Sequence, residues 1–324
     1  MTKKTAWRAV AEALEAEGVR HIFGLPGNPK HLVYDIDEHT DIDFVLVRDE
    51  KSAVSCAYAY ARLKRQPGVV FSNPGPGITT LVTGLLEATS GSLPVVAIVN
   101  GVVEAHNGMG AFQELDAVAL MRPVTKWAVR VTDPSRVPWV IERAFAVAMN
   151  GRPGAVFIEI PSDLGDVPVD MPAYRPGYRR HLTRPDPQAV AKAAEALARA
   201  RRPLIWCGSG AVFSGAAPAV AALADKVGMA VMTTPGGRGI YPEDGPLALG
   251  QTGLYFTAPG KAWFDEADLI LSVGTRLEAF STNSWQFWPK DATFIQLDID
   301  PETIGMNKRP DIALVGDAAL TLAD

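Results

Sequence analysis

Residues 68–100 read GVVFSNPGPGITTLVTGLLEATSGSLPVVAIVN, and this stretch decides the fold class. Two short runs rich in Val and Ile flank a segment, from about residue 78 to residue 90, that is expected to be a helix. A double Pro-Gly turn separates the first run from this helix. Continuous apolar runs that alternate with helices are typical of parallel strands buried on both faces. We therefore expect a strand–helix–strand unit of a parallel α/β sheet.

The same alternation continues in both directions along the chain. Around the opening stretch, strands are predicted in RHIFGLPGN, DFVLVR, TKWAVRV and GAVFIEIP, with helices over 50–64 and 134–149. Beyond it, the pattern resumes with helices over 187–201 and 215–227 and strands in PLIWCG, MAVMTT, ADLILSVG and ATFIQLDID. The segment in between, over 171–186, is rich in Pro and Arg and lacks a period. We predict two doubly wound parallel-sheet domains, over 1–170 and 187–324, joined by a linker.

Composition and charge exclude several classes of protein. The 324 residues carry a net charge of -5, which argues against a nucleic-acid or anionic-membrane partner. Cys56 and Cys207 lie far apart and form no CxxC or Cys/His cluster, so neither a disulfide framework nor a metal site is predicted. No apolar run approaches the roughly 18 residues of a membrane span. We predict a cytoplasmic protein.

The segments that follow strands directly are the candidates for ligand binding. Doubly wound sheets bind ligands beyond the carboxyl ends of their strands, which places GLPGN, RDE, NPGPG and NGVVEAHNG along one edge. Glu50, in RDE, opens the helix over 50–64. Acids in a first helical turn commonly favour only the helix dipole, and Asp49 meets that need equally well. The local sequence leaves a capping and a catalytic role for Glu50 open.

Two loops of the first half carry further candidates. The glycines of the turn from Pro74 to Gly77 would let the backbone approach a ligand near a helix N-terminus, although a tight turn also explains them. The turn matches neither GxGxxG nor a P-loop. The loop EAHNGMGAFQELD contributes His106, Gln113 and Glu114. A loop histidine is more often a solvated bystander, and Glu114 could cap the next helix.

The second half offers weaker signals. Gly208 and Gly210 form a glycine turn after the strand PLIWC, a dinucleotide-like pattern without the full fingerprint. Gly274 and Arg276 follow the strand ADLILSV, where the arginine could meet a phosphate. A surface arginine is the commoner explanation.

Taken in order, these stretches resemble thiamine-diphosphate-dependent enzymes of the acetolactate synthase group. The resemblance rests on FGLPGN, RDEKSAVSCAYAYAR, SNPGPGITTLVTGLLEA, GAFQELDAVALMRPVTKWA and RPGAVFIEIPSDL, then GIYPEDGPLALGQTG, ADLILSVGTRLE and IQLDIDPETIGMNKRPDIALVGDA. It is collinear over nearly the whole chain. It implies that residues 1–170 form the pyrimidine-binding domain and residues 187–324 the central domain.

The resemblance also assigns roles to individual residues. Glu50 matches the glutamate whose carboxyl group hydrogen-bonds a ring nitrogen of the cofactor's aminopyrimidine and so promotes loss of the thiazolium C2 proton. Gln113 would contact substrate or an intermediate. The cofactor pocket would be lined by Pro26, Gly27, Pro74, Gly75, Pro76 and Gly77. Further candidates for substrate contact or proton relay are Asn28, His106 and Phe112.

Two departures from the family pattern limit what the resemblance implies. Members usually continue into a third domain that binds the diphosphate through Mg²⁺, with a Gly-Asp-Gly motif and a later Asn, and nothing here matches it. We therefore expect thiamine diphosphate and Mg²⁺ to bind only with that domain, from a separate subunit in a dimer of heterodimers or, alternatively, from a longer natural chain. Acetolactate synthases hold a flavin near segments matching GQTGLYF and GTRLEAFS, so FAD, another adenine nucleotide or no ligand stays open for the central domain.

The function expected from this resemblance is that of a lyase, carboligase or decarboxylase acting on a 2-keto acid. A 2-hydroxyacyl-CoA lyase or an oxalyl-CoA decarboxylase-like enzyme is an alternative on the same fold. A non-catalytic, nucleotide-binding regulatory subunit is a second alternative. The presence of Glu50 together with the PGPG and FQE segments favours an enzyme, because a regulator has no need of the carboxylate.

Overall fold

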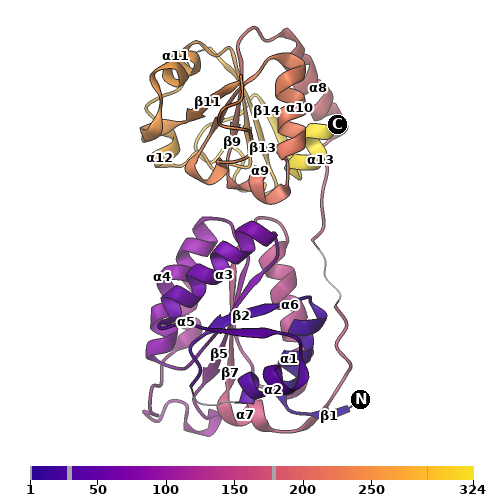
Figure 1. Cartoon of the computed structure of the whole chain (residues 1–324), viewed down its shortest axis with the longest axis vertical. Coiled ribbons are helices and arrows are strands. Elements are labelled where there is room, and N and C mark those ends of the chain that lie inside the picture. Colours follow the sequence, from indigo (N-terminus) through magenta and orange to yellow (C-terminus); the bar gives the residue numbers. More distant parts are fainter. Residues whose placement is uncertain (1, 28–30, 177–179, 290) are drawn as a thin grey trace. The chain divides into compact units, whose positions relative to one another are not determined.

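The computed structural model describes residues 2–27, 31–176, 180–289 and 291–324. They form two compact units, Met1–Arg180 and His181–Asp324, drawn from indigo to pink and from rose to yellow in Figure 1. Each unit contains one six-stranded sheet in which neighbouring strands are parallel. The predicted class, two doubly wound parallel sheets, is confirmed.

The sheet of the first unit has the strand order β3-β2-β4-β5-β7-β6. Its strands are β2 (His21–Gly24), β3 (Asp43–Leu46), β4 (Gly68–Ser72), β5 (Val95–Gly101), β6 (Trp127–Arg130) and β7 (Ala155–Pro161). Every residue of β4, β5 and β7 is buried, as expected for central strands with helices on both faces.

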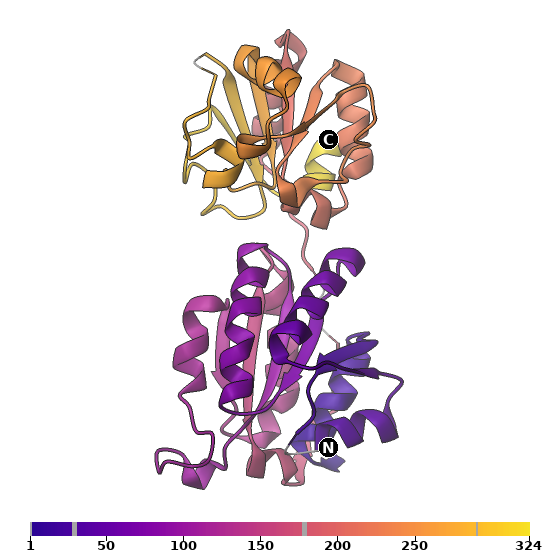
Figure 2. The same ribbon diagram turned by 60° about the vertical axis from the view of Figure 1, so that its left-hand side comes forward.

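Helices cover both faces of this sheet, as Figure 2 shows. One face packs against α1 (Ala6–Ala16), α2 (His31–His39) and α6 (Val137–Met149). The other face packs against α3 (Glu50–Lys64), α4 (Pro76–Ser90) and α5 (Ala117–Met121). The predicted helix over 50–64 is confirmed, whereas α4 begins two residues before the predicted start because proline is well suited to a first helical position.

The remaining short elements of the first unit include a two-stranded antiparallel ribbon. It pairs β1 (Thr2–Lys4) with β8 (Val169–Met171), and neither strand was expected from the sequence. The other short elements are α7 (Ser162–Asp166) and the 3-10 turns η1 (Glu104–His106), η2 (Arg122–Val124) and η3 (Pro134–Arg136). Beyond β8, the Tyr174 hydroxyl donates to the Glu17 carboxylate, so this part of the segment predicted as linker is held by the first unit.

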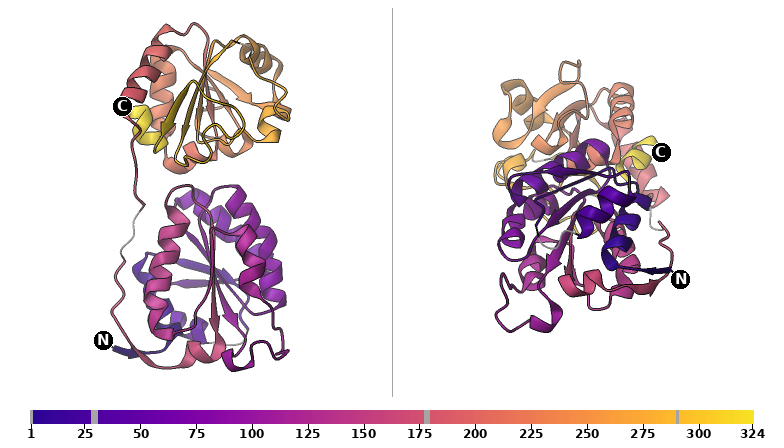
Figure 3. Two further views of the ribbon diagram at one scale, coloured as in Figure 1. Left: turned by 180° about the vertical axis from the view of Figure 1, so that it is seen from behind. Right: turned by 60° about the horizontal axis from the view of Figure 1, so that its bottom comes forward.

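The sheet of the second unit has the strand order β11-β10-β9-β12-β13-β14, and Figure 3 shows it from behind. The strands are β9 (Pro203–Cys207), β10 (Ala230–Thr233), β11 (Ala248–Gln251), β12 (Leu269–Val273), β13 (Thr293–Asp298) and β14 (Ile312–Val315). One face packs against α8 (Pro187–Arg199), α10 (Ala217–Val227) and α13 (Ala318–Ala323), and the other against α11 (Ala258–Glu266). Shorter helical elements are α9 (Ser209–Ser214), α12 (Ala279–Thr282), η4 (Pro235–Gly237) and η5 (Gly253–Tyr255). Within the described ranges, no helix combines the length and apolar character needed to cross a bilayer.

Candidate active site

The carboxyl edge of the first sheet has a topological switch point between β2 and β4. The chain leaves β2 toward β3 on one side and leaves β4 toward β5 on the other, so the loops after these strands diverge. The Asn73 side chain joins the two loops, because its Nδ2 donates to the Leu25 carbonyl at 3.0 Å. Its Oδ1 is buried without a hydrogen-bond partner among the described residues. Open α/β sheets bind their ligands at such a point.

Glu50 opens α3 beside this crevice, but it does not cap the helix. The N-cap is Asp49, whose carboxylate accepts the Ser52 N–H and the Ser52 hydroxyl, both at 2.8 Å. These hydrogen bonds, led by the backbone one, lower the pKa of Asp49. The role that could explain an acid in this turn is therefore filled by Asp49. Glu50 is only 8% exposed and needs another explanation.

The two carboxylate oxygens of Glu50 have different surroundings. Oε2 accepts a hydrogen bond from the Thr80 hydroxyl of α4 at 2.9 Å. No hydrogen bond to Oε1 is found among the described residues. Oε1 faces Gly77, where a Cβ would lie 3.1 Å from Oε1 and 2.6 Å from the Ser72 hydroxyl. The missing side chain of Gly77 therefore lets α4 approach this carboxylate oxygen and the Ser72 hydroxyl closely.

Gly75 brings the Gln113 loop against the same crevice. Gly75 has φ +61° and ψ −112°, a conformation essentially restricted to glycine. A Cβ at this position would lie 2.8 Å from the Gln113 Cβ and 2.9 Å from its carbonyl oxygen. Gln113 itself has φ +65°, which is uncommon for a residue with a side chain. Left-handed strain of this kind is concentrated at functional sites.

The other predicted cofactor-pocket residues of the first unit are Gly27 and three prolines. A Cβ on Gly27 would lie 2.5 Å from the Asn73 amide, so Gly27 belongs to the crevice. Pro76 is exposed as the first residue of α4, and Pro26 is exposed as well, while Pro74 is partly buried. Asn28 lies outside the described residues.

The loop before Gln113 places two other candidates in solvent. His106 ends η1 with an exposed side chain that hydrogen-bonds neither Glu50 nor Gln113 within the described chain. Phe112 is 87% exposed. Glu114 is not the cap of α5, which is Asp116; instead it accepts the N–H groups of Gly108 and Ala111, the latter at 2.8 Å. The hydrogen bond from the Gly108 N–H, and after it the one from Ala111, lowers the pKa of Glu114, which therefore holds the loop together as an anion.

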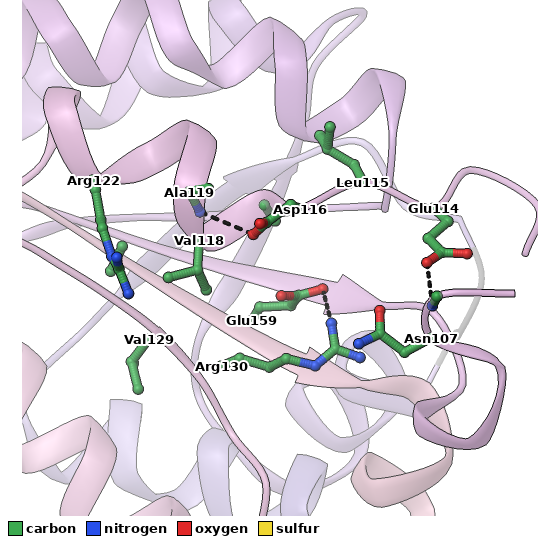
Figure 4. A pocket seen from close by; sticks show the side chains of 13 residues that line it. Asn107, Glu114, Leu115, Asp116, Val118, Ala119, Arg122, Val129, Arg130 and Glu159 are labelled. Carbon is green, nitrogen blue, oxygen red and sulfur yellow. Dashed lines mark hydrogen bonds and ion pairs between the residues drawn. The ribbon is translucent and has the colours of Figure 1, made fainter. Parts of the chain in front are cut away.

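A hollow with a volume of about 580 Å³ is lined in part by Asn107, Gly108 and Glu114 of this loop (Figure 4). Its floor contains Glu159 of β7, which pairs with Arg130 of β6 at 2.7 Å, and Arg130 also pairs with Glu104 at 2.7 Å. Burial raises the pKa of Glu159, while Arg130 opposes the shift. Sequence reasoning missed this cluster. The available signal was a single charged residue inside the apolar run AVFIEIP, because a buried charge needs a partner.

The glycines of the second unit contact one another. Gly210 donates its N–H to the Gly274 carbonyl at 3.0 Å, and a Cβ on Gly208 would lie 2.3 Å from that carbonyl oxygen. The loops after β9 and β12 are thus packed together, which gives these glycines a structural role. Arg276 lies 3.6 Å from Glu278 in an ion pair. Across the described parts of both units, no group of three or more His, Cys, Asp or Glu side chains is arranged to hold a metal.

Comparison with known sequences assigns the family. Residues 4–120 match the profile described as thiamine pyrophosphate enzyme, N-terminal TPP binding domain, and residues 190–324 match the profile of the thiamine pyrophosphate enzyme central domain. The chain belongs to the thiamine pyrophosphate (thiamine diphosphate) enzyme family, as the resemblance predicted.

Within this family, the chain is similar to several curated acetolactate synthases. A probable acetolactate synthase large subunit of Methanocaldococcus jannaschii is 39% identical over 98% of this chain and 54% of its own length. Acetolactate synthases of Arthrospira platensis and Mycobacterium bovis are 35% and 36% identical over 98% and 99% of the chain, and 57% and 52% of their own lengths. The chain spans about half the length of the curated relatives it matches.

Proposed function

We propose that this chain is the pyrimidine-binding and central part of a thiamine diphosphate-dependent enzyme similar to acetolactate synthase. It would form or cleave the bond next to the carbonyl of a 2-keto acid. The observation that carries the proposal is the Glu50 carboxylate, which is buried, relieved of helix capping by Asp49, and open at Oε1 toward Gly77. The names of the relatives support the reaction class.

The crevice suits an aminopyrimidine ring in three respects. Oε1 of Glu50 can exchange a hydrogen bond and a proton with a ring nitrogen. Gly27 and Gly77 present backbone and no side chain toward this point of the sheet, and the Asn73 Oδ1 is an acceptor without a partner among the described residues. When bound, thiamine diphosphate would supply the electron sink for carbon–carbon chemistry. Gln113 can both donate and accept, and it would orient the substrate beside the Gly75 turn.

The diphosphate and its Mg²⁺ require hard oxygen ligands, and we assign them to sequence outside residues 1–324. We propose that a separate subunit supplies this part and that two such pairs assemble, so that each site forms between chains. For the second unit, FAD or another adenine nucleotide is the candidate ligand. The contact between Gly208 and Gly274 argues against a phosphate seated at α9, so such a ligand would lie beyond that junction.

The test begins with affinity purification of the natural protein and mass spectrometry of what accompanies it. The assembled enzyme is then assayed for products with pyruvate and with a 2-hydroxyacyl-CoA. Glu50→Gln should reduce kcat by at least about a hundredfold, since general acid–base groups contribute that much. Asp49→Asn is the matched control, because asparagine caps helices as well as aspartate does and should preserve activity. Full activity of Glu50→Gln would falsify the proposed role of Glu50.

A further inference from the structure

Thr80 is the residue that contacts the Glu50 carboxylate directly. It lies in the second turn of α4, and its Oγ1 is 2.9 Å from Glu50 Oε2. The same Oγ1 is 3.0 Å from the Pro76 carbonyl and 3.0 Å from the Gly77 carbonyl. A hydroxyl group carries one hydrogen, so three acceptors surround a single donor.

This arrangement can satisfy both protonation states of the carboxyl group. When Glu50 is ionised, the Thr80 hydroxyl donates to Oε2. When Oε2 carries a proton, the hydroxyl accepts it and turns its own hydrogen to the Pro76 or Gly77 carbonyl, a common bond for threonine within a helix. Neither state leaves the buried carboxyl oxygen without a partner, which avoids a substantial desolvation cost.

We propose that Thr80 is a positioning residue that holds Oε2 of Glu50 in both protonation states of the carboxyl group. It thereby leaves Oε1 to the cofactor ring. The inference rests on the proposed function for the meaning of Oε1, although the contact itself does not. One helix contacts both oxygens: Thr80 holds Oε2, and Gly77, three residues earlier on the same face, places no side chain against Oε1.

Thr79 provides a matched control on the same helix. Thr79 is exposed, as Thr80 is, and its hydroxyl is 3.0 Å from the Pro76 carbonyl, but it forms no hydrogen bond with Glu50. Thr79→Val and Thr80→Val both replace a hydroxyl by a methyl group and remove a contact with the Pro76 carbonyl. Thr80→Val also removes the contact with the Gly77 carbonyl and the donor to Glu50. No ionisable side chain occurs between Pro76 and Leu86, and the flanking charges Asp49 and Lys51 are unchanged in both variants.

The first measurement uses the full chain without cofactor. Glutamate labelled with carbon-13 at the carboxyl carbon is followed by NMR at neutral pH, and the Glu50 signal is identified by its loss in Glu50→Gln. Thr80→Val should displace the Glu50 signal, because the carboxylate loses its donor. The Glu50 signals of Thr80→Ser and Thr79→Val should coincide with that of the unmodified chain. An unshifted Thr80→Val, or an equal shift in Thr79→Val, overturns the inference.

The second measurement uses the assembled enzyme. Thr80→Val should lower kcat by about tenfold, as expected when a carboxylate loses one hydrogen bond, with KM for the 2-keto acid unchanged and with rescue by Thr80→Ser. A change in KM with kcat unaltered, or failure of serine to rescue, contradicts a positioning role. The two proposals fail separately: a fully active Glu50→Gln refutes the proposed function, whereas an undisplaced Glu50 signal refutes only the role of Thr80.

Discussion

Replacement of Gly77 by alanine separates the function of the crevice from the stability of the helix that borders it. The new Cβ would lie 2.6 Å from the Ser72 hydroxyl and 3.1 Å from Glu50 Oε1. Both atoms are side-chain ends, and among the described residues the Ser72 hydroxyl donates only to the Asn73 carbonyl, at a long 3.3 Å, so it can rotate away. Alanine also favours helix over glycine by up to about 1 kcal/mol. We expect Gly77→Ala to change the free energy of unfolding by less than about 1 kcal/mol.

Activity should respond quite differently to the same substitution. The methyl group would occupy the space in front of Oε1 and displace the carboxylate by a few tenths of an ångström or more. Misplacement of a catalytic group on the order of 1 Å can reduce the rate about a hundredfold. We therefore expect kcat/KM of the assembled enzyme to fall by about two orders of magnitude in Gly77→Ala.

Gly84→Ala, later on the same helix, is the control. Its Cβ would lie 2.5 Å from Cβ and 2.7 Å from Cγ1 of the fully buried Val54, where α3 and α4 pack together. Overpacking costs about 1–3 kcal/mol, so a net loss of about 1–2 kcal/mol is expected after the gain in helix propensity. Urea unfolding followed by circular dichroism measures both variants. Near-normal kcat/KM in Gly77→Ala, or equal destabilisation of the two variants, would refute the reasoning.

Three further predictions concern other parts of the chain. Burial raises the pKa of Glu159 above its ordinary 4.5, so its contribution to stability is full below pH 4.5 and declines as pH rises through the folded-state value. The urea concentration at the midpoint of unfolding should therefore decline less steeply with pH in Glu159→Gln than in the unmodified chain, and equal slopes would contradict this. Burial also raises the pKa of Cys207 to about 12, so a thiol reagent should label only the exposed Cys56 until the chain unfolds, and rapid labelling of two thiols in the folded chain would disprove the burial. Gln113→Gly should raise the free energy of unfolding by about 0.5–1 kcal/mol, because glycine relieves the left-handed backbone, while kcat falls; a less stable variant would show that the strain is absent.

The parts of the fold that the sequence predicts best are the central strands and the long amphipathic helices. β4, β5 and β7 are buried on both faces, so their sequences must be continuously apolar and are easily recognised. β11 and β14, which were not predicted, are four-residue strands at the two edges of the second sheet. An edge strand has only one neighbour and partial burial, which leaves little pattern to recognise.

The candidate site shows the same division between local and long-range information. The glycines could be predicted as turn residues, but the residue that packs against each one is remote in sequence. Gly75 packs against Gln113, and Gly27 packs against Asn73. Thr80 was not predicted as a site residue, because a threonine in a helix has no local signature of a contact with a glutamate thirty residues earlier. The cluster of Arg130, Glu104 and Glu159 likewise depends on β6, the turn η1 and β7, which only the folded sheet brings together.

The pair Asp49–Glu50 shows why local sequence could not settle its own question. Either acid could have capped α3, and the helix dipole favours both. In the folded chain Asp49 has an extended backbone (φ −156°, ψ 156°), from which its short side chain reaches the Ser52 N–H at 2.8 Å. Glu50, one residue later, is already helical, and its longer side chain extends to Thr80 of α4 instead. The cap is thus complete without Glu50, which leaves a buried side chain at the switch point of the sheet, and we propose that a bound ligand gives this carboxylate its role.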